Sequence, residues 1–303
     1  MDIDDYILFD GNTDFCNGAD YNICFSGGKD SAYMAYILAE EGYNIDLHFV
    51  NTGMELPGML EYVESFANAI DVPIYIWYNP FITWDTQFYK IRQRGRSEGL
   101  LRGFPKITTP CWANRDLKQP IFKVVNSLDG KKCIGFAYDE KHRADADMFQ
   151  SDKYVFPLID RKIEEKTCRK ELEKLGLLNP LYEYFNRLGC FCCPYQSKDS
   201  LRMLHKHFPE QWGQLIDYCR DSPHEFSINY ADPRELERAF SQQASLDIWQ
   251  TPAPKRNLTR EEIEAFNIEN EGYVSICKGI PSGSPEQFTY MQFNSCLQPL
   301  VQK

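Results

Sequence analysis

The amino-acid sequence predicts an α/β protein with a doubly wound, mostly parallel sheet and a helical carboxy-terminal appendage. Short apolar runs alternate with segments of helical period from Tyr21 to about Pro157, which is the pattern of β-α-β units and a parallel sheet. After Asp160 this alternation ends, and charged amphipathic helices follow. We therefore expect a core domain over residues 1–200 and a helical and irregular region over residues 201–303.

Five short strands are expected in the core, because each is an apolar or aromatic run of strand length. They cover residues 23–25, 45–50, 72–77, 132–137 and 154–159. Helical segments stand between most of them, and this order is typical of a doubly wound sheet.

Helices are expected where apolar residues recur at a spacing of three or four residues. The first ends before Gly42, a residue suited to the left-handed conformation that closes a helix. The expected helices cover residues 31–41, 60–70, 162–175, 200–207, 211–220 and 233–243, and the end of a further helix covers 121–128. From about Thr251 no clear periodicity remains.

Composition and charge restrict the classes of function. Hydrophobic residues make up 43% and charged residues 25% of the 303 residues, as in ordinary globular proteins and unlike disordered or fibrous chains. The formal net charge of −11 disfavours broad adhesion to nucleic acid or to an anionic membrane, although it leaves room for a local basic groove. The only basic concentration consists of Arg92, Arg94, Arg96 and Arg102.

Neither a signal peptide nor a membrane partner is expected. The first residues are acidic and lack the basic and apolar regions of a signal peptide, and no apolar run approaches the roughly 18 residues that cross a bilayer. We therefore expect a chain in the reducing cytoplasm. Clustered cysteines in that compartment are more often metal ligands or reactive thiols than disulfides.

The sharpest local signal is a glycine-rich loop between the first expected strand and its helix. Two glycines let the backbone turn tightly and bring its N–H groups close to an oxyanion, and the helix adds its positive amino-terminal end. Lys29 supplies a charge for phosphate oxygens, and Asp30 supplies a hard oxygen ligand for Mg²⁺. The loop is not a Walker A motif, because Asp30 occupies the Ser/Thr position and Ile23 the position of the first glycine. The full loop reads Ser26-Gly27-Gly28-Lys29-Asp30-Ser31.

A cluster of cysteines is the second signal. Cys190, Cys192 and Cys193 stand together, and Cys111 lies far from them in the sequence. Thiolates close in sequence, completed by one from afar, suit an iron–sulfur centre or a tetrahedral Zn²⁺. Cys190 and Cys193 form the better pair, so Cys192 is either a fourth ligand or a free thiol. The scattered cysteines are expected to pack in the core; they are Cys16, Cys24, Cys133, Cys168, Cys219 and Cys277.

In their order along the chain these motifs resemble those of the phosphoadenosine-phosphosulfate (PAPS) reductase-like family of the pyrophosphate-loop (ATP pyrophosphatase) superfamily. The resemblance runs from about Tyr21 to Tyr195. Residues 26–31 match the superfamily's S-G-G-x-D-S loop, and residues 51–55 are similar to the family's D-T-G-x-E. Further similar segments are residues 111–118, 135–143, 156–160, 179–182 and 189–194.

The resemblance implies an adenine nucleotide, either ATP with Mg²⁺ or PAPS, at the carboxyl ends of the strands. Lys29, Asp30 and Arg143 are expected to be catalytic. Two departures remove charges from the expected site, because Asn51 replaces the family's Asp and Ala137 replaces its Arg. The residues that the resemblance assigns to the nucleotide are Ser26, Gly27, Gly28, Lys29, Asp30, Ser31, Thr52, Gly53, Glu55 and Lys118.

The resemblance also implies a [4Fe–4S] cluster. Its ligands would be Cys111, Cys190 and Cys193, with or without Cys192, and Zn²⁺ is the alternative occupant. Three functions follow as hypotheses. The favoured one is ATP-dependent adenylation of an acceptor followed by sulfur transfer, because the loop retains Lys29 and its neighbours in full.

The two alternatives are a sulfonucleotide reductase that releases sulfite and a catalytically silent nucleotide-binding partner protein. The tail around Cys296 lacks the reductases' E-C-G-[IL]-H segment, which disfavours the first. The acceptor stays open between a tRNA, a DNA and a small molecule. A sulfur-donor or other partner protein and a homodimer stay open as well.

Overall fold

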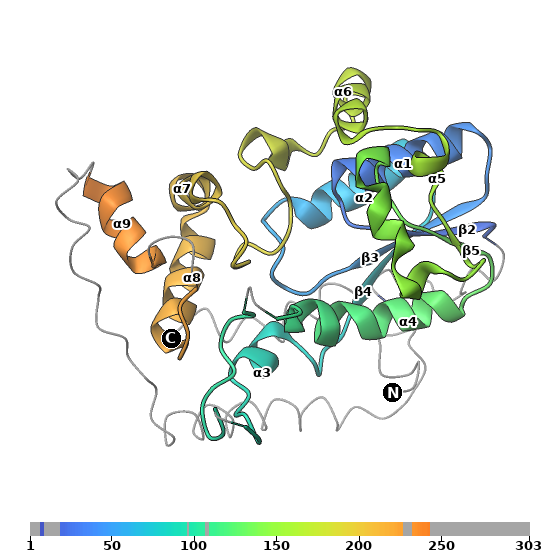
Figure 1. Ribbon diagram of the computed structural model, residues 1–303. Coiled ribbons are helices and arrows are strands. Elements are labelled where there is room, and N and C mark those ends of the chain that lie inside the picture. The colour runs from blue at the N-terminus through green and yellow to red at the C-terminus, as the bar shows by residue number, and fades with distance from the viewer. Residues whose placement is uncertain (1–6, 9–18, 96, 107–108, 227–231, 243–303) are drawn as a thin grey trace.

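The protein is described by a computed structural model that covers residues 7–8, 19–95, 97–106, 109–226 and 232–242. Its centre is a six-stranded sheet in the order β1-β4-β3-β2-β5-β6 (Figure 1). β1 pairs antiparallel with β4, and every other pair is parallel. The strands are β1 (Ile7–Leu8), β2 (Tyr21–Phe25), β3 (Ile45–Val50), β4 (Ile74–Tyr78), β5 (Lys131–Cys133) and β6 (Tyr154–Val155).

The strand order places a topological switch point beside β2. From β2 the chain continues through β3 to β4 on one side, and it then returns to β5 and β6 on the other side. Ile23 of β2 is therefore in register with Leu47 of β3 and with Cys133 of β5. Ligands of open α/β sheets bind in the crevice outside the carboxyl ends of the strands at such a point. The glycine-rich loop begins directly after β2, so it lies at this crevice.

Helices cover both faces of the sheet. α1 and α2 lie on one face and α4 on the other (Figure 1), where α4 buries Ile121 and Val125 against Trp77 of β4. The α-helices are α1 (Lys29–Glu40), α2 (Met59–Ala69), α3 (Trp84–Phe88), α4 (Gln119–Ser127), α5 (Pro157–Asp160), α6 (Glu165–Leu175), α7 (Lys198–His207), α8 (Pro209–Asp221) and α9 (Pro233–Gln242). A π-helix, η2 (Asn114–Lys118), and three 3₁₀-helices, η3 (Tyr138–Asp145), η4 (Asp147–Phe149) and η5 (Pro180–Glu183), complete the set in the described residues.

The expected α/β class and the mostly parallel sheet are confirmed, with helices α7, α8 and α9 grouped beside the sheet (Figure 1). Leu201 of α7 and Leu215 of α8 belong to the same cluster of buried residues as Ile23. The domain boundary at residue 200 stays a prediction. None of the helices in the described part of the chain is long and apolar enough to cross a membrane.

Two expected strands are shorter than the apolar pattern indicates. The strand expected over 154–159 ends at Val155, and Pro157 begins α5. Proline has no backbone N–H for a strand ladder, and its fixed φ suits the first turn of a helix. The strand expected over 132–137 ends at Cys133. The sequence pattern also missed β1, α3 and η2.

Candidate functional site

Gly27 fixes the shape of the glycine-rich loop. Its φ is +70°, in the left-handed region, and a Cβ at this position would lie 2.4 Å from the Sδ atom of Met59 on α2. A side chain is therefore excluded both by the backbone conformation and by the close approach of α2. Gly28 is the N-cap residue of α1, so the loop leads directly into the amino-terminal end of that helix.

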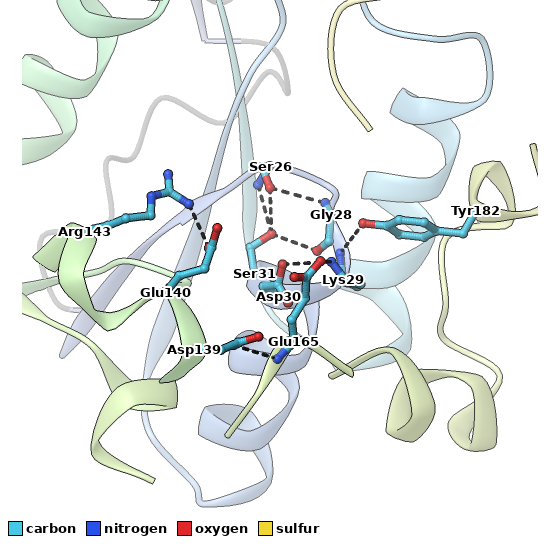
Figure 2. A network of polar contacts seen from close by, with 10 residues as sticks. All are labelled: Ser26, Gly28, Lys29, Asp30, Ser31, Asp139, Glu140, Arg143, Glu165 and Tyr182. Atoms are coloured by element: carbon cyan, nitrogen blue, oxygen red, sulfur yellow. Dashed lines mark hydrogen bonds and ion pairs between the residues drawn. The ribbon is translucent and has the colours of Figure 1, made fainter. Parts of the chain in front are cut away.

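Two serine side chains close the loop on itself (Figure 2). The Ser31 hydroxyl donates to the Gly28 carbonyl oxygen at 3.0 Å and accepts from the Ser26 backbone N–H at 3.2 Å. The hydroxyl oxygens of Ser26 and Ser31 are 3.0 Å apart. Because the single Ser31 proton points to Gly28, the Ser26 hydroxyl donates in this last bond. The turn is thus held in shape by its own first and last residues.

The Asn-Pro-Leu-Tyr segment supports the loop from behind. Asn179 donates through Nδ2 to the Gly27 carbonyl oxygen at 3.0 Å, and the Lys29 backbone N–H donates to the Tyr182 hydroxyl at 3.0 Å. Both side chains are buried. A third support comes from Gly135, where a Cβ would lie 3.0 Å from the backbone nitrogen of Ser31. In the sequence, Gly135, Asn179 and Tyr182 belong to segments that resemble family motifs, but the resemblance assigned no role to these three residues.

The Lys29 ammonium is held between two carboxylates (Figure 2). Its Nζ lies 2.5 Å from Oε1 of Glu165 and 3.2 Å from Oδ2 of Asp30. Burial lowers the pKa of Lys29, but the two acids outweigh burial and raise it, so the ammonium stays charged. The backbone N–H of Glu165 in turn donates to Oδ1 of Asp139 at 3.2 Å. Glu165 is a site residue that sequence reasoning missed, since it stands 136 residues from its partner.

Asp30 is the loop residue best suited to a cation. Burial raises the pKa of its carboxyl group, with Lys29 and a contact from the Cys168 thiol opposing the shift, and its buried Oδ1 has no N–H or O–H donor. A carboxylate oxygen of this kind beside an anion-binding turn fits a nucleotide-bound Mg²⁺, which takes one or two carboxylates together with phosphate oxygens. No group of three or more His, Cys, Asp or Glu residues in the described part of the chain is placed to hold a metal ion by itself.

The second predicted loop, residues 51–55, is organised by Glu55. The Glu55 carboxylate accepts from the Thr52 N–H at 2.9 Å, the Met54 N–H at 3.1 Å and the Thr52 hydroxyl at 2.8 Å. Its oxygens are therefore engaged in shaping the turn. Asn51 accepts from the Gly53 N–H at 2.9 Å through its side-chain oxygen, a turn-forming bond that an Asp could also make. The departure at this position keeps the turn and removes the charge.

Lys118, at the end of η2, joins this loop to the cysteines. Its Nζ is 4.0 Å from Oε1 of Glu55. Burial lowers the pKa of Lys118, whereas the neighbouring Cys190, Glu55, Cys111 and Cys193 raise it and prevail. Three of the four predicted metal ligands thus act electrostatically on one ammonium group, although they are up to 82 residues apart in the sequence.

The four thiols have the donor chemistry of an iron–sulfur or zinc site, but the structure does not place three of them for a metal ion. Burial raises the pKa of the Cys190 thiol to about 12, so it is protonated near neutral pH. Cys192 is fully buried in the core, where burial raises the pKa of its thiol as well. The cluster and its alternative, Zn²⁺, stay predictions, and no reaction step is derived through them. The eight described cysteines form no disulfide, and Cys133, Cys168 and Cys219 are buried as expected. Cys24 is only partly buried, and Cys16 and Cys277 lie outside the described residues.

Arg143 lies apart from the Lys29 network. It donates to Oε2 of Glu140 at 2.8 Å, and its guanidinium carbon is 4.1 Å from the centroid of the Phe136 ring. Figure 2 shows Arg143 and Glu140 on the opposite side of the loop from Tyr182. The structure therefore brings Lys29 and Asp30 together but does not add Arg143 to their polar contacts. The catalytic role of Arg143 stays a prediction.

Comparisons with known proteins find similarity over part of the chain. No family model matches. Two relatives are uncharacterized proteins of Methanocaldococcus jannaschii, one 22% identical over 214 residues and the other 24% identical over 216 residues. These alignments cover 68% and 66% of this chain but 50% and 41% of the relatives. The chain therefore matches half or less of the length of these relatives.

Two solved structures match part of this chain. One is a PAPS reductase from Candida auris in a phosphate complex, with 14% identity, a TM-score of 0.40, and coverage of 57% of this chain and 82% of that one. The other is a predicted subunit of a tRNA methyltransferase from M. jannaschii, with 19% identity, a TM-score of 0.32, and coverage of 64% and 91%.

Proposed function

We propose that this protein is a nucleotide-using enzyme of the pyrophosphate-loop type that adenylates an acceptor with ATP and then exchanges the activated oxygen for sulfur. The observation that carries the proposal is the loop itself. A turn that requires glycine at Gly27 and is closed by Ser26 and Ser31 presents a charged lysine and a buried carboxylate oxygen without an N–H or O–H donor at the switch point of the sheet. This combination suits a polyphosphate with its Mg²⁺.

The contacts of Lys29 indicate how a nucleotide would enter. Glu165 and Asp30 offset the lysine charge in the described structure. A triphosphate that reaches Lys29 replaces Glu165 as its partner, while Asp30 turns to the Mg²⁺ that accompanies the phosphates. Glu165 is about half exposed, with 48% of its side chain accessible, so it can leave toward solvent. Glu165 therefore acts as a placeholder for the phosphate.

The adenylation step balances without a protein nucleophile. An acceptor oxygen attacks the α-phosphorus of ATP, a new P–O bond forms, and the bond to the bridging oxygen of the β-phosphate breaks. Pyrophosphate leaves with the electron pair, and the acceptor proton passes to water. Lys29 stabilises the charge that develops on pyrophosphate, and the rigid loop holds the leaving group in place.

The sulfur step needs a donor, which we assign to the hydrosulfide class. Sulfur attacks the activated acceptor atom, the bond from that atom to the adenylate oxygen breaks, and AMP leaves with the electron pair. The cluster of Cys111, Cys190 and Cys193 around Lys118 is the part of the described chain where such a donor would be held. The second turn, shaped by Glu55, borders this cluster, because the Phe191 N–H donates to the Met54 carbonyl oxygen at 3.0 Å.

The test compares the two nucleotides directly. The anaerobically purified protein is incubated with MgATP or with PAPS, together with hydrosulfide and with nucleic-acid and small-metabolite fractions as sources of acceptor. Pyrophosphate and AMP from ATP are the expected products. Sulfite from PAPS would overturn the proposal in favour of the reductase, whose tail thiol Cys296 lies outside the described residues. Iron, sulfide and zinc assays on the same sample decide what the cysteines hold.

A further inference from the structure

A large basic cleft lies beside the candidate site. Its volume is about 1140 Å³, and it is formed by the chain between α3 and α4. A hairpin makes one wall, because Ile91 bridges to Leu101 and the backbone N–H of Arg102 donates to the Lys90 carbonyl oxygen at 2.8 Å. The other wall includes Trp112 and Asp116, which lie just before and within η2.

The charge of this cleft is opposite to that of the whole chain. The formal net charge of the protein is −11, yet the cleft has a single acidic lining residue, Asp116. Its basic lining residues are Lys90, Arg92, Arg94, Arg102, Lys106 and Arg115. A cleft lined by one sign of charge concentrates ligands of the other sign. Three of the four arginines that are close together in the sequence, Arg92, Arg94 and Arg102, thus line this cleft, and Arg96 lies outside the described residues.

The one acid does not neutralise the six cations. Asp116 is shared between Arg102, at 2.6 Å, and Arg115, at 2.6 Å. Among the described residues, the exposed side chains of Lys90, Arg94 and Lys106 have no acidic partner.

Arg92 has no acidic partner among the described residues either, and the Arg102 guanidinium is a charged neighbour. Its Nη2 donates to the Arg102 carbonyl oxygen at 2.9 Å and to Nε2 of His224 at 3.0 Å, while its Nε is buried without a hydrogen-bond partner. The pKa of Arg92 is lowered by burial and by the Arg102 charge. Excess positive charge of this kind is stabilised by an anionic ligand.

We propose that this cleft binds the phosphodiester backbone of a nucleic-acid strand. Its volume exceeds the roughly 300–1,000 Å³ of ordinary small-molecule pockets. Its cations come from separate parts of the lining, with Lys90, Arg92, Arg94 and Arg102 on the hairpin segment and Lys106 and Arg115 after it, and such a set suits a ligand with several phosphates. RNA and DNA share this backbone chemistry, so the experiment has to distinguish them.

The cleft and the cysteines share one segment of chain. Thr109, Pro110 and Trp112 line the cleft, whereas Cys111 and Lys118 lie near Cys190. A nucleic-acid strand bound in the cleft is therefore separated by one segment of the protein chain from the place that we assign to the sulfur donor. The inference that the strand is the acceptor rests on the proposed function. The binding of the strand to the cleft does not.

The test measures fluorescence anisotropy of a labelled 20-nucleotide single-stranded RNA and of the DNA of the same sequence, with the full chain and no nucleotide. The cleft variant is Arg94→Glu/Lys106→Glu, which changes two exposed residues outside the catalytic loop. The matched control is Lys123→Glu/Lys170→Glu, which makes the same change of net charge on the exposed surfaces of α4 and α6. Circular dichroism melts establish that both variants fold.

We expect saturable binding by the wild type, at least tenfold weaker binding by the cleft variant, and unchanged binding by the control. The dependence of log K on log salt should become shallower by about 1.4 in the cleft variant, because each lost phosphate contact on a single strand contributes about 0.7. Tighter binding of one probe identifies RNA or DNA as the ligand. Equal weakening in both variants, or no saturable binding of either probe below about 100 µM, would overturn the proposal.

Pyrophosphate release is measured in the same samples after addition of MgATP. Strand binding that is lost in the cleft variant, without any pyrophosphate release by the wild type, supports the cleft and counts against the proposed function. Pyrophosphate release that is equal in the wild type and the cleft variant supports the proposed function and overturns the strand as acceptor.

Discussion

The contact between Lys29 and Glu165 leads to an unusual prediction, because its removal should raise the affinity for MgATP. If Glu165 holds the place of a phosphate, Glu165→Gln should tighten MgATP binding, although it removes an ion pair from the free protein. The Lys29 side chain is 11% exposed and the Glu165 side chain 48% exposed. Solvent therefore screens the pair, and we take its contribution as about 0.5–1 kcal/mol.

This magnitude sets the expected results. Removing the competing carboxylate should strengthen MgATP binding by roughly two- to fivefold, since about 1.4 kcal/mol corresponds to a factor of ten. The free energy of unfolding of the nucleotide-free variant should fall by the same 0.5–1 kcal/mol or so, because the contact exists only in that state. Isothermal titration calorimetry measures the first quantity, and urea unfolding measures the second.

Glu171→Gln is the matched control. It breaks an ion pair of the same kind on the same helix, with Lys174 at 2.6 Å, away from the glycine-rich loop. Its MgATP affinity should equal that of the wild type. If Glu165→Gln weakens MgATP binding instead, Glu165 contributes to the bound state, and the placeholder interpretation is refuted.

Three further predictions concern the loop, its support by Tyr182, and the buried carboxyl group of Asp46 on β3. Gly27→Ala should cost at least about 2 kcal/mol in the free energy of unfolding, because it adds left-handed strain to a Cβ placed 2.4 Å from Met59 Sδ; urea unfolding with unchanged stability would contradict this. Tyr182→Phe leaves the Lys29 N–H without its acceptor at 3.0 Å, so it should cost about 1–3 kcal/mol of stability and weaken MgATP binding, and calorimetry showing neither loss would argue against a supporting role. Burial raises the pKa of Asp46 to about 6, so its stabilising protonated form is present below pH 4 and lost as the pH rises through 6. The free energy of unfolding of the wild type should therefore fall relative to that of Asp46→Asn between these two pH values. A difference between the two proteins that stays constant with pH would disprove the shift.

Sequence reasoning located the chemistry of the site better than its architecture. The glycine-rich loop was predictable because strand, turn glycines, lysine and helix are consecutive, so local conformation determines the arrangement. Glu165 and Tyr182 were not predictable as loop contacts, since they stand 136 and 153 residues from Lys29 and only the folded chain brings them together. Glu55 shows the converse. The motif marks it as a nucleotide ligand, but three bonds to its own turn occupy its carboxylate.

In the fold, too, local features were predictable from the sequence and long-range contacts were not. The strand at Ile45–Val50 was predicted to the residue, because its apolar run has clear ends and it is buried along its whole length. The expected strands at 132–137 and 154–159 were too long, because Gly135 approaches α1 closely and Pro157 begins a helix. The basic cleft illustrates the largest gap. The sequence shows several arginines near one another, whereas their convergence with Lys90, Lys106 and Arg115 depends on the hairpin and on η2.

The most direct test of the central claim is the affinity for MgATP of the wild type beside Lys29→Met and Lys170→Met. Each variant removes one ammonium group, but Lys29 lies in the glycine-rich loop, and Lys170 lies on the exposed surface of α6. A charge-assisted contact to phosphate contributes about 1.5–3 kcal/mol, so Lys29→Met should bind MgATP roughly 10- to 150-fold more weakly. Lys170→Met should bind as the wild type does. Equal affinity of all three proteins would contradict the claim that the loop binds the nucleotide.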